Sequence, residues 1–264
     1  MLLAIPFPDL DPVLVAIGPI AVRWYALAYM AGIVLGWLYL RRAAGFAPAV
    51  LDREKIDDLL LWATLGIVVG GRLGYALFYK LEYFLDHPVE IFMVWKGGMS
   101  FHGGLLGIAF VVARAARAGG APVLALADRV AMVAPIGLFF GRLANFVNAE
   151  LYGRPSDLPW AVIFPGGGPV GRHPSQLYEA ALEGLLLLVV LAVLGRSATL
   201  RARHGFLAGV FLAGYGAARG FVELFREPDA HLGFLWGGLT MGQLLCLPML
   251  AAGIALMARA RARP

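Results

Sequence analysis

The stretch MVAPIGLFFGRLANFVNAELYG, residues 132–153, joins an apolar run to a dense set of polar groups. Its first nine residues carry no charge, and Arg142, Asn145, Asn148 and Glu150 then follow within nine positions. An ionised side chain at membrane depth costs several kcal/mol, so it normally faces the interior of a helix bundle and marks function. If the chain is a membrane protein, this stretch predicts a helix that ends in a functional polar layer.

Composition places the chain among membrane proteins. It has 264 residues, of which 60% are hydrophobic and 15% charged, and its mean hydropathy is +0.76. This is more apolar material than one soluble core can bury, so we expect an all-α, polytopic membrane helix bundle. The net charge of +5 does not indicate a nucleic-acid partner, because the basic residues form neither a run nor a stripe.

Seven apolar segments approach the length of about 20 residues that a transmembrane helix needs. They are residues 17–40, 56–79, 99–118, 125–147, 176–195, 204–225 and 238–258. We expect about seven transmembrane helices in a single integral membrane domain, residues 1–264. Glycines at four-residue spacing, Gly205 with Gly209 and Gly216 with Gly220, permit close packing of the sixth helix.

Basic residues set the expected orientation. The first, third and fifth loops and the C-terminal end hold 12 of them, whereas the opposite side holds five. Because Lys and Arg concentrate on the cytoplasmic side, we expect the N-terminus outside and the C-terminus in the cytoplasm. The start, MLLAIPFPDLDP, has no basic region, so we expect no cleavable signal and targeting by the first helix.

The connection between the fourth and fifth apolar segments is long. Residues 148–175 contain five Pro and five Gly, which predicts an irregular or short-stranded external loop segment rather than a domain.

With this orientation, six of the seven segments send polar groups to the outer, periplasmic half of the bilayer. They are Tyr25, Arg72, His102, Arg142, Asn145, Asn148, Glu150, Glu179, Glu183, Tyr215, Arg219, Glu223 and Arg226. Asp128 and Arg129, at the inner end of the fourth segment, are the exception. Buried pairs such as Arg219 with Glu223 could simply hold helices together. A whole layer is better explained by function, because structural pairs have no reason to gather at one depth.

The arginines of this layer indicate a phosphate-bearing ligand. Their guanidinium groups need anionic counter-charge, and the planar fork of guanidinium suits phosphate. The nearest abundant anion at that depth is a phospholipid headgroup.

Two histidines are candidates for proton transfer. His102 lies in the Gly-rich turn GGMSFHGG, where glycines allow a ligand to approach the backbone, and imidazole is a competent base near neutral pH. A hydrogen-bonding role is the alternative for His102. For His173, in the external RHPSQ turn, the hydrogen-bonding role is favoured.

These residues lie in blocks that resemble one family. GRLANFVNAELYG resembles the signature of the prolipoprotein diacylglyceryl transferases, bacterial inner-membrane enzymes that begin lipoprotein maturation. The likeness extends in family order through GPIAVRWYALAYMAG, GGRLGYALFY, WKGGMSFHGGLLG, RHPSQLYEAALEG, GYGAARGFVELFREPDA and TMGQLLCLPM. The chain has Ala144 and Ala149 where Gly is frequent, and it lacks the longer external insertion of some members.

The resemblance implies transfer of a diacylglyceryl group from phosphatidylglycerol to the lipobox cysteine thiol of a preprolipoprotein, with release of glycerol phosphate. Phosphatidylglycerol, membrane lipid and the lipobox peptide are the implied partners, and the implied location is the bacterial inner membrane. The important positions of the family fall on Tyr25, His102, Arg142, Asn145, Glu150, Gly153, Tyr215 and Arg219.

A thioether at the glyceryl carbon that carried phosphate implies an in-line displacement by a thiolate. A free thiol has a pKa of about 8.5, so a base is required, and His102 is the first choice. Arg142 and Arg219 are expected to clamp the phosphodiester and to stabilise charge on the leaving phosphate. The phosphatidylglycerol-binding group comprises these two arginines with Tyr25, Asn145, Glu150, Gly153 and Tyr215.

Within this group, Asn145 and Tyr215 would orient the headgroup, Glu150 would hold an arginine or order the loop, and Gly153 would serve the turn. No cofactor or metal is expected, because phosphate already leaves well and the sequence has no His or Cys cluster at ligand spacing.

A transporter or flippase of an anionic lipid or solute is the alternative function. It would line both halves of the membrane with polar groups, whereas the inner half here carries little beyond Asp128 and Arg129. A retinal-type receptor needs a Schiff-base lysine, and residues 238–258 have none. Ser100 and His102 are too close in one turn to act as a protease nucleophile and its base.

Overall fold

The computed structural model describes residues 4–8, 10–18, 20–228 and 235–260. The chain divides into two compact units, one from Met1–Tyr39 with Asp128–Pro264 and the other from Leu40–Ala127. The boundaries between the units fall near one end of each of two long helices, α1 (Trp24–Ala43) and α5 (Val123–Val147).

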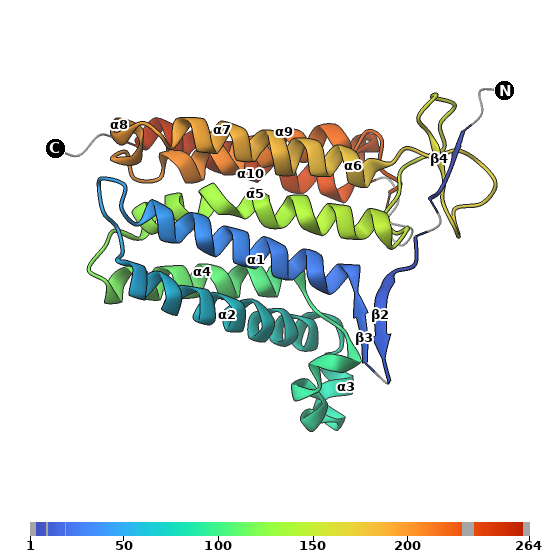
Figure 1. Ribbon diagram of the computed structural model, residues 1–264, viewed down its shortest axis with the longest axis horizontal. Coiled ribbons are helices and arrows are strands. Elements are labelled where there is room, and N and C mark those ends of the chain that lie inside the picture. Colours follow the sequence, from blue (N-terminus) through green and yellow to red (C-terminus); the bar gives the residue numbers. More distant parts are fainter. Residues whose placement is uncertain (1–3, 9, 19, 229–234, 261–264) are drawn as a thin grey trace. The chain divides into compact units, whose positions relative to one another are not determined.

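Helices form most of the described part of the first unit (Figure 1). After α5 come α6 (Ser175–Glu179), the π-helical segment η3 (Ala180–Leu186), α7 (Leu187–Leu194), α8 (Ala198–Arg201), α9 (Phe206–Val222), the 3-10 turn η4 (Trp236–Gly238) and α10 (Met241–Arg259). Segments α6, η3 and α7 follow one another as a continuous helix over Ser175–Leu194. Met132 of α5, Leu187 and Leu191 of α7 and Leu207 of α9 form a buried apolar cluster that holds these helices together.

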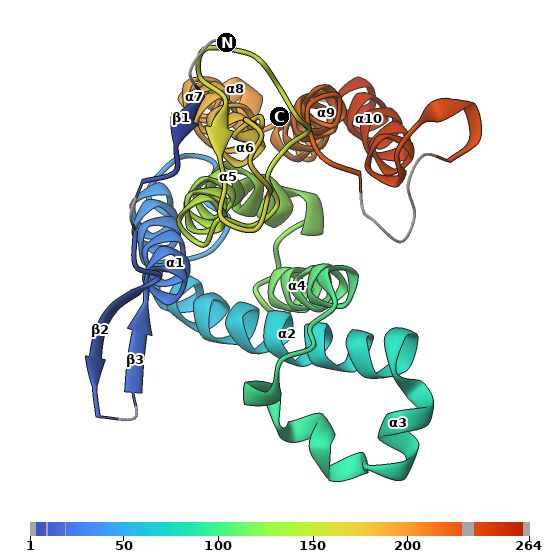
Figure 2. The same ribbon diagram turned by 90° about the vertical axis from the view of Figure 1, so that its right-hand side faces the viewer.

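Small residues bring α9 and α10 close together, and the two helices lie side by side (Figure 2). A Cβ added to Gly209 would lie 2.8 Å from the Gly253 carbonyl oxygen, and one added to Gly216 would lie 3.3 Å from that of Cys246. Any side chain at Gly209 would therefore separate the helices. The close packing predicted from the glycine spacing is confirmed at these two positions.

The second unit consists of α2 (Arg53–Tyr79), α3 (Leu81–Asp86), the 3-10 turns η1 (Pro88–Phe92) and η2 (Val94–Lys96), and α4 (Phe101–Ala118). Asp52 caps α2 by accepting a hydrogen bond from the Lys55 backbone N–H at 2.8 Å. Helices α2 and α4 pack directly on each other. A Cβ on Gly107 would lie 1.9 Å from the Gly66 carbonyl oxygen, so this contact is made by backbone.

Arg72, which the sequence argument placed in the polar layer, has a local structural role. Its guanidinium donates to the backbone carbonyls of Ile91 at 2.9 Å, Glu90 at 2.5 Å and Gly97. The side chain is buried and lies over the Phe84 ring. Because carbonyl oxygens of the 90–98 loop occupy the guanidinium, Arg72 holds that loop on α2.

The N-terminal part of the first apolar segment is not helical. Val13–Ile17 (β2) and Ile20–Arg23 (β3) form an antiparallel hairpin, and α1 begins at Trp24 rather than near residue 17. β-Branched residues favour strands, and Gly18 takes a positive φ of 59° at the turn. Residues 148–175 contain one short strand, Val162–Ile163 (β4), which pairs in parallel with Ile5–Pro6 (β1).

Four described helices are long and apolar enough to cross a membrane. They are Arg53–Tyr79, Val123–Val147, Ser175–Leu194 and Met241–Arg259, while Phe206–Val222 is apolar but shorter. This agrees with the predicted class, a membrane protein made mostly of helices. Each of the seven apolar segments contains or coincides with a helix, and the count of seven spans and the orientation stay predictions.

Candidate active site

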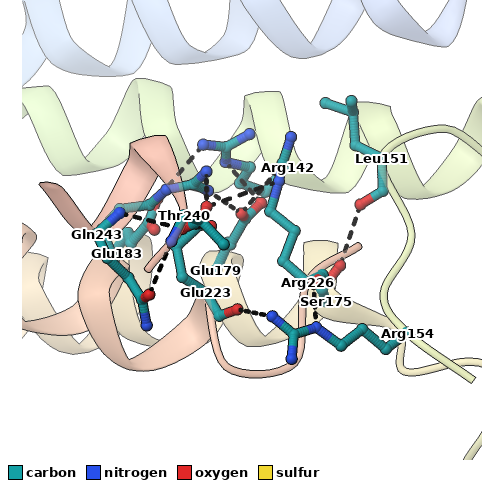
Figure 3. A network of polar contacts seen from close by, with 11 residues as sticks. Arg142, Leu151, Arg154, Ser175, Glu179, Glu183, Glu223, Arg226, Thr240 and Gln243 are labelled. Atoms are coloured by element: carbon teal, nitrogen blue, oxygen red, sulfur yellow. Dashed lines mark hydrogen bonds and ion pairs between the residues drawn. The ribbon is translucent and has the colours of Figure 1, made fainter. Parts of the chain in front are cut away.

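Glu179, the last residue of α6, is the centre of a buried ion-pair network in the first unit (Figure 3). Its side chain has no solvent exposure and contacts three arginines. Arg142 Nε lies 3.1 Å from Glu179 Oε2, Arg226 Nη1 lies 3.1 Å from Oε1, and Arg219 Nη1 also contacts Oε1. These arginines come from α5, from α9 and from the chain just beyond α9, so one carboxylate joins three segments.

Glu183 extends the network from the π-helical segment η3. Its side chain is also fully buried, and its Oε2 lies 3.5 Å from Arg142 Nη2, the longest contact that Arg142 makes with a carboxylate. A π-helical turn contains an additional residue relative to an α-helical turn, and such turns recur at functional sites. Here η3 begins directly after Glu179 and contains Glu183.

Glu223, which directly follows α9, links the network to Thr240 at the start of α10. Its Oε1 contacts Arg219 and lies 3.8 Å from Arg226 Nε, and its Oε2 accepts a hydrogen bond from Thr240 Oγ1 at 2.6 Å. Thr240 also caps α10 in a reciprocal arrangement with Gln243. A Cβ at Gly242 would lie 2.6 Å from the Glu223 carboxylate, so glycine is required beside it.

The charges of this network balance. Three guanidinium groups, Arg142, Arg219 and Arg226, face three carboxylates, Glu179, Glu183 and Glu223. The sequence argument assumed that the arginines required an external anion, yet the chain itself supplies their counter-charge. The Arg219–Glu223 pair weighed as a structural alternative is present. It belongs to this larger network.

A second polar group lies where α5 ends. Asn145 Nδ2 donates to Glu150 Oε1 at 2.7 Å, so Glu150 holds an amide rather than an arginine in this contact. The Glu150 carbonyl accepts from Gln176 Nε2 at 2.6 Å, which ties this turn to α6. The Tyr25 hydroxyl interacts with both Asn145 and Glu150, and it lies 3.3 Å from the Tyr29 hydroxyl. The structure therefore brings Tyr25, Asn145 and Glu150 together.

The backbone around Glu150 is strained. Ala149 and Leu151 have φ values of 53° and 58°, a region that residues other than glycine rarely adopt. This accounts for the frequent Gly at the position of Ala149 in the family signature. Such strain costs about 1–3 kcal/mol and persists where surrounding contacts fix the chain, often at functional sites.

Gly153 and Arg154 connect the segment 148–175 to the end of α9. Gly153 forms an antiparallel bridge with Arg226, and a Cβ there would lie 2.4 Å from the Phe225 carbonyl oxygen. Arg154 donates from Nε to the Arg226 carbonyl at 2.8 Å and from Nη2 to that of Glu223 at 3.2 Å. These contacts hold the backbone of two network residues in place.

We expect Gly153→Ala to lower the free energy of unfolding by about 1–3 kcal/mol, because the added methyl group must displace backbone. Thermal unfolding of the purified protein measures this change. Gly141→Ala, within α5, is the matched control, because a Cβ there meets nothing within 4 Å. It should be neutral or slightly stabilising, since Ala favours helix more than Gly. Equal unfolding midpoints for the two variants would contradict the close approach at Gly153.

Tyr215 and His102 complete the residues predicted from the sequence. Tyr215 lies one turn before Arg219 on α9, packs against the apolar cluster of the first unit and interacts electrostatically with Glu183 and Arg142. His102 belongs to the second unit, where it is the exposed second residue of α4.

His173 has the hydrogen-bonding environment expected for it. Its Nδ1 lies 3.2 Å from the Tyr178 hydroxyl, which accepts a hydrogen bond from Trp160 Nε1 at 2.8 Å. Burial, with a smaller contribution from Arg154, lowers the pKa of His173 from its ordinary value. The neutral imidazole is therefore favoured in the folded protein.

Sequence reasoning underestimated several members of the network. Glu179, Glu183, Glu223 and Arg226 were placed in the polar layer but not among the site residues, and Arg154 and Thr240 were missed. The pattern TMGQ, residues 240–243, carries the capping-box signal that could have located Thr240.

Membrane-length helices and a buried network of arginines and glutamates define a membrane protein made mostly of helices, with a buried cluster of charged side chains. The family model for prolipoprotein diacylglyceryl transferase matches residues 12–259, and the chain belongs to this family. It is similar to proteins named phosphatidylglycerol–prolipoprotein diacylglyceryl transferase from several bacteria. The one from Paramagnetospirillum magneticum is 56% identical over 264 residues, which cover 100% of this chain and 98% of the relative.

The relative from Rhodospirillum rubrum is 56% identical over 99% of this chain and 96% of its own length. The relative from Rhizobium meliloti is 56% identical over 97% and 94%. These full-length matches identify the chain as a transferase and favour this function over transport.

Proposed function

We propose that the protein transfers the diacylglyceryl group of phosphatidylglycerol to the lipobox cysteine thiol of a preprolipoprotein. Membership of the family supports this reaction, and so do the names of the relatives. The structural observation that carries it is the convergence of three arginines on the fully buried Glu179. Such a preorganised set of guanidinium groups in a dry site is suited to stabilising a phosphate.

Arg142 is the arginine best placed to bind the phosphodiester. Its side chain is 18% exposed, compared with 15% for Arg219 and 11% for Arg226, and its contact with Glu183 is long at 3.5 Å. A phosphate oxygen could replace Glu183 beside Arg142 Nη2 while Nε keeps Glu179. Arg219 contacts Glu179 and Glu223 through its two terminal nitrogens, so it would stabilise charge on the phosphate from a fixed position.

The chemical step is a displacement at the glyceryl carbon that carries the phosphate. The cysteine sulfur forms a bond with this carbon, the carbon–oxygen bond breaks, and its electron pair leaves with glycerol phosphate. The thiol proton must be removed first, and His102 is the proposed base. Arg142 and Arg219 would offset the charge that develops on the leaving phosphate.

The remaining site residues would position the headgroup. Asn145 and Tyr25 lie beside each other at the end of α5, and Glu150 orients the Asn145 amide through a 2.7 Å hydrogen bond. Tyr215 would present its hydroxyl beside Glu183 and Arg142. The close backbone contacts of Gly153 support a role in shaping the turn rather than in contacting the lipid.

The membrane arrangement is part of the proposal. We place the protein in the bacterial inner membrane with seven spans, the N-terminus outside and the C-terminus in the cytoplasm, as the distribution of basic residues indicates. The network around Glu179 would then lie in the periplasmic half, with residues 148–175 forming the external segment of a single membrane domain.

The decisive experiment incubates the purified protein with phosphatidylglycerol and a peptide that contains a lipobox cysteine. Mass spectrometry should detect a peptide carrying a thioether-linked diacylglyceryl group, together with released glycerol phosphate. A peptide with serine in place of the cysteine should gain no diacylglyceryl group. Absence of product with the cysteine peptide would reject the proposed transfer.

We expect His102→Gln to lower the transfer rate by about 10²-fold or more, the usual contribution of a general base. Below a thiol pKa of about 8.5 the thiolate fraction rises tenfold with each pH unit, so the residual activity should increase with pH. A pH–rate profile of transfer to the lipobox peptide measures both effects. A variant with the wild-type rate and profile would show that His102 is not the base.

A further inference from the structure

Glu183 is less completely bonded than the other carboxylates of the network. Its side chain has no solvent exposure, and its Oε2 lies 3.5 Å from Arg142 Nη2. Glu179 Oε2, by comparison, lies 3.1 Å from Arg142 Nε. Within the described residues, Oε1 of Glu183 accepts no hydrogen bond and belongs to no ion pair. The fold thus buries a carboxylate while using only one of its oxygens.

The other two carboxylates of the network use both oxygens. Glu179 contacts arginines through Oε1 and Oε2. Glu223 contacts Arg219 through Oε1 and accepts a hydrogen bond from Thr240 Oγ1 at 2.6 Å through Oε2. A buried polar atom without a hydrogen bond is costly, and more so when it is charged, so native structures rarely contain one. Glu183 Oε1 is therefore an acceptor suited to a donor from a ligand.

The backbone on both sides of Glu183 keeps its carboxylate inside the network. A Cβ added to Gly184 would lie 2.7 Å from Phe139 Cα, so η3 packs directly on α5 one turn before Arg142. Leu187, four positions after Glu183, is buried in the apolar cluster of the first unit. Since Glu183 is held between these contacts, a donor has to reach it. The side chain of Arg142 is 18% exposed, so a ligand that reaches Arg142 also comes close to Glu183.

Binding of the phosphate would increase the need for a donor at Glu183. In the proposed function a phosphate oxygen takes the place of Glu183 beside Arg142 Nη2, which removes the 3.5 Å contact between the two side chains. The new donor should carry no positive charge, because the guanidinium of Arg142 stays close by. A hydroxyl meets this requirement, since it donates a hydrogen bond and is neutral.

We propose that Glu183 binds the hydroxyls of the headgroup glycerol of phosphatidylglycerol and so determines the preference for this headgroup. The inference rests on the transfer reaction proposed above. The headgroup glycerol is joined to the phosphate and has two neighbouring hydroxyls, and a carboxylate can accept from both. Such bonds are strong because the acceptor is ionised. Glu183 would hold the leaving glycerol phosphate in place while Arg142 binds its phosphate.

The test compares transfer to the lipobox peptide from phosphatidylglycerol and from phosphatidylpropanol, whose three-carbon headgroup has no hydroxyl. The wild type should prefer phosphatidylglycerol by about 10²-fold in kcat/KM, because the analogue leaves the buried carboxylate unpaired. Glu183→Gln should reduce this preference to about fivefold, since a neutral amide oxygen accepts a weaker hydrogen bond. A general loss of structure would lower both rates together and leave their ratio unchanged.

Glu223→Gln is the matched control. It removes one negative charge from the same network, but both oxygens of Glu223 already have partners in the protein. This variant should lower both rates and keep the wild-type preference. Glu183→Asp provides a second variant if Glu183→Gln does not fold. It keeps the charge and withdraws the carboxylate by one methylene, so the preference should fall at least about fivefold.

Several outcomes would overturn the role of Glu183. One is a wild type that uses both lipids equally well, and another is an unchanged preference in Glu183→Gln and Glu183→Asp. An equal loss of preference in Glu223→Gln would attribute the effect to charge balance. Faster transfer from phosphatidylethanolamine than from phosphatidylglycerol would show that Glu183 binds a cation rather than hydroxyls. Absence of any transfer from phosphatidylglycerol by the wild type would instead reject the proposed function, which separates the two failures.

Discussion

Replacing Glu179 with Gln is expected to destabilise the protein by about 3–5 kcal/mol and to abolish measurable transfer. The substitution keeps the shape of the side chain but leaves three arginines facing two carboxylates in a buried site. Breaking a buried ion pair is costly because an uncompensated charge remains in a medium that solvates it poorly. The apparent unfolding midpoint should fall on the order of 10 °C.

A surface ion pair provides the control for Glu179→Gln. Glu227 lies 2.7 Å from Arg172 Nη1, but its side chain is 47% exposed. Glu227→Gln should therefore cost about 0–1 kcal/mol and leave transfer intact. If both glutamine variants unfolded at the same temperature, Glu179 would not be the electrostatic centre of the network.

A double variant distinguishes the contribution of Glu179 to charge balance from its contribution to the transfer reaction. In Glu179→Gln/Arg226→Gln the network again has equal numbers of positive and negative groups, so part of the lost stability should return. Activity should not return, because Arg142 and Arg219 still lack the carboxylate that both contact. Recovery of activity along with stability would mean that Glu179 matters for folding alone.

The sequence could predict that polar residues of several apolar segments come together, while their depth in the membrane stays a prediction. Arg142 and Asn145 follow an apolar run, and Glu179 and Glu183 begin another, so their positions along membrane helices can be read directly. Which carboxylate each arginine contacts could not be predicted in this way. It depends on how α5, α6 and α9 pack and on the π-helical turn after Glu179, which are tertiary features without a residue-level signal.

The structure differs from the sequence-based expectation at two other places, and local backbone geometry is the cause at both. Arg72 lies within an apolar helix, as Arg142 and Arg219 do, but the loop at 90–98 folds back and supplies carbonyl acceptors. The segment that begins near residue 17 is apolar enough for a helix, yet its β-branched residues and the turn at Gly18 produce a hairpin before α1. In both cases local backbone geometry, which hydropathy does not reveal, decided the structure.

Arg142→Lys is expected to lower kcat/KM for transfer by about 10²–10³-fold with little change in stability. Lysine keeps the positive charge, so the carboxylates of Glu179 and Glu183 stay neutralised. An ammonium is a point charge and cannot hold Glu179 through one nitrogen while offering a second, fixed nitrogen to phosphate. Loss of one preorganised donor to a developing anion costs about 3–4 kcal/mol in known cases.

The loss in Arg142→Lys should appear mainly in kcat if the guanidinium stabilises the leaving phosphate, and mainly in KM if it only holds the bound lipid. Steady-state kinetics with the lipobox peptide and phosphatidylglycerol separates these possibilities. Arg172→Lys is the control, because Arg172 pairs with the exposed Glu227 outside the network. This variant should transfer the diacylglyceryl group at the wild-type rate. Near-normal kcat/KM for Arg142→Lys would remove Arg142 as the phosphate clamp and leave Arg219, which contacts two carboxylates, to bind the headgroup.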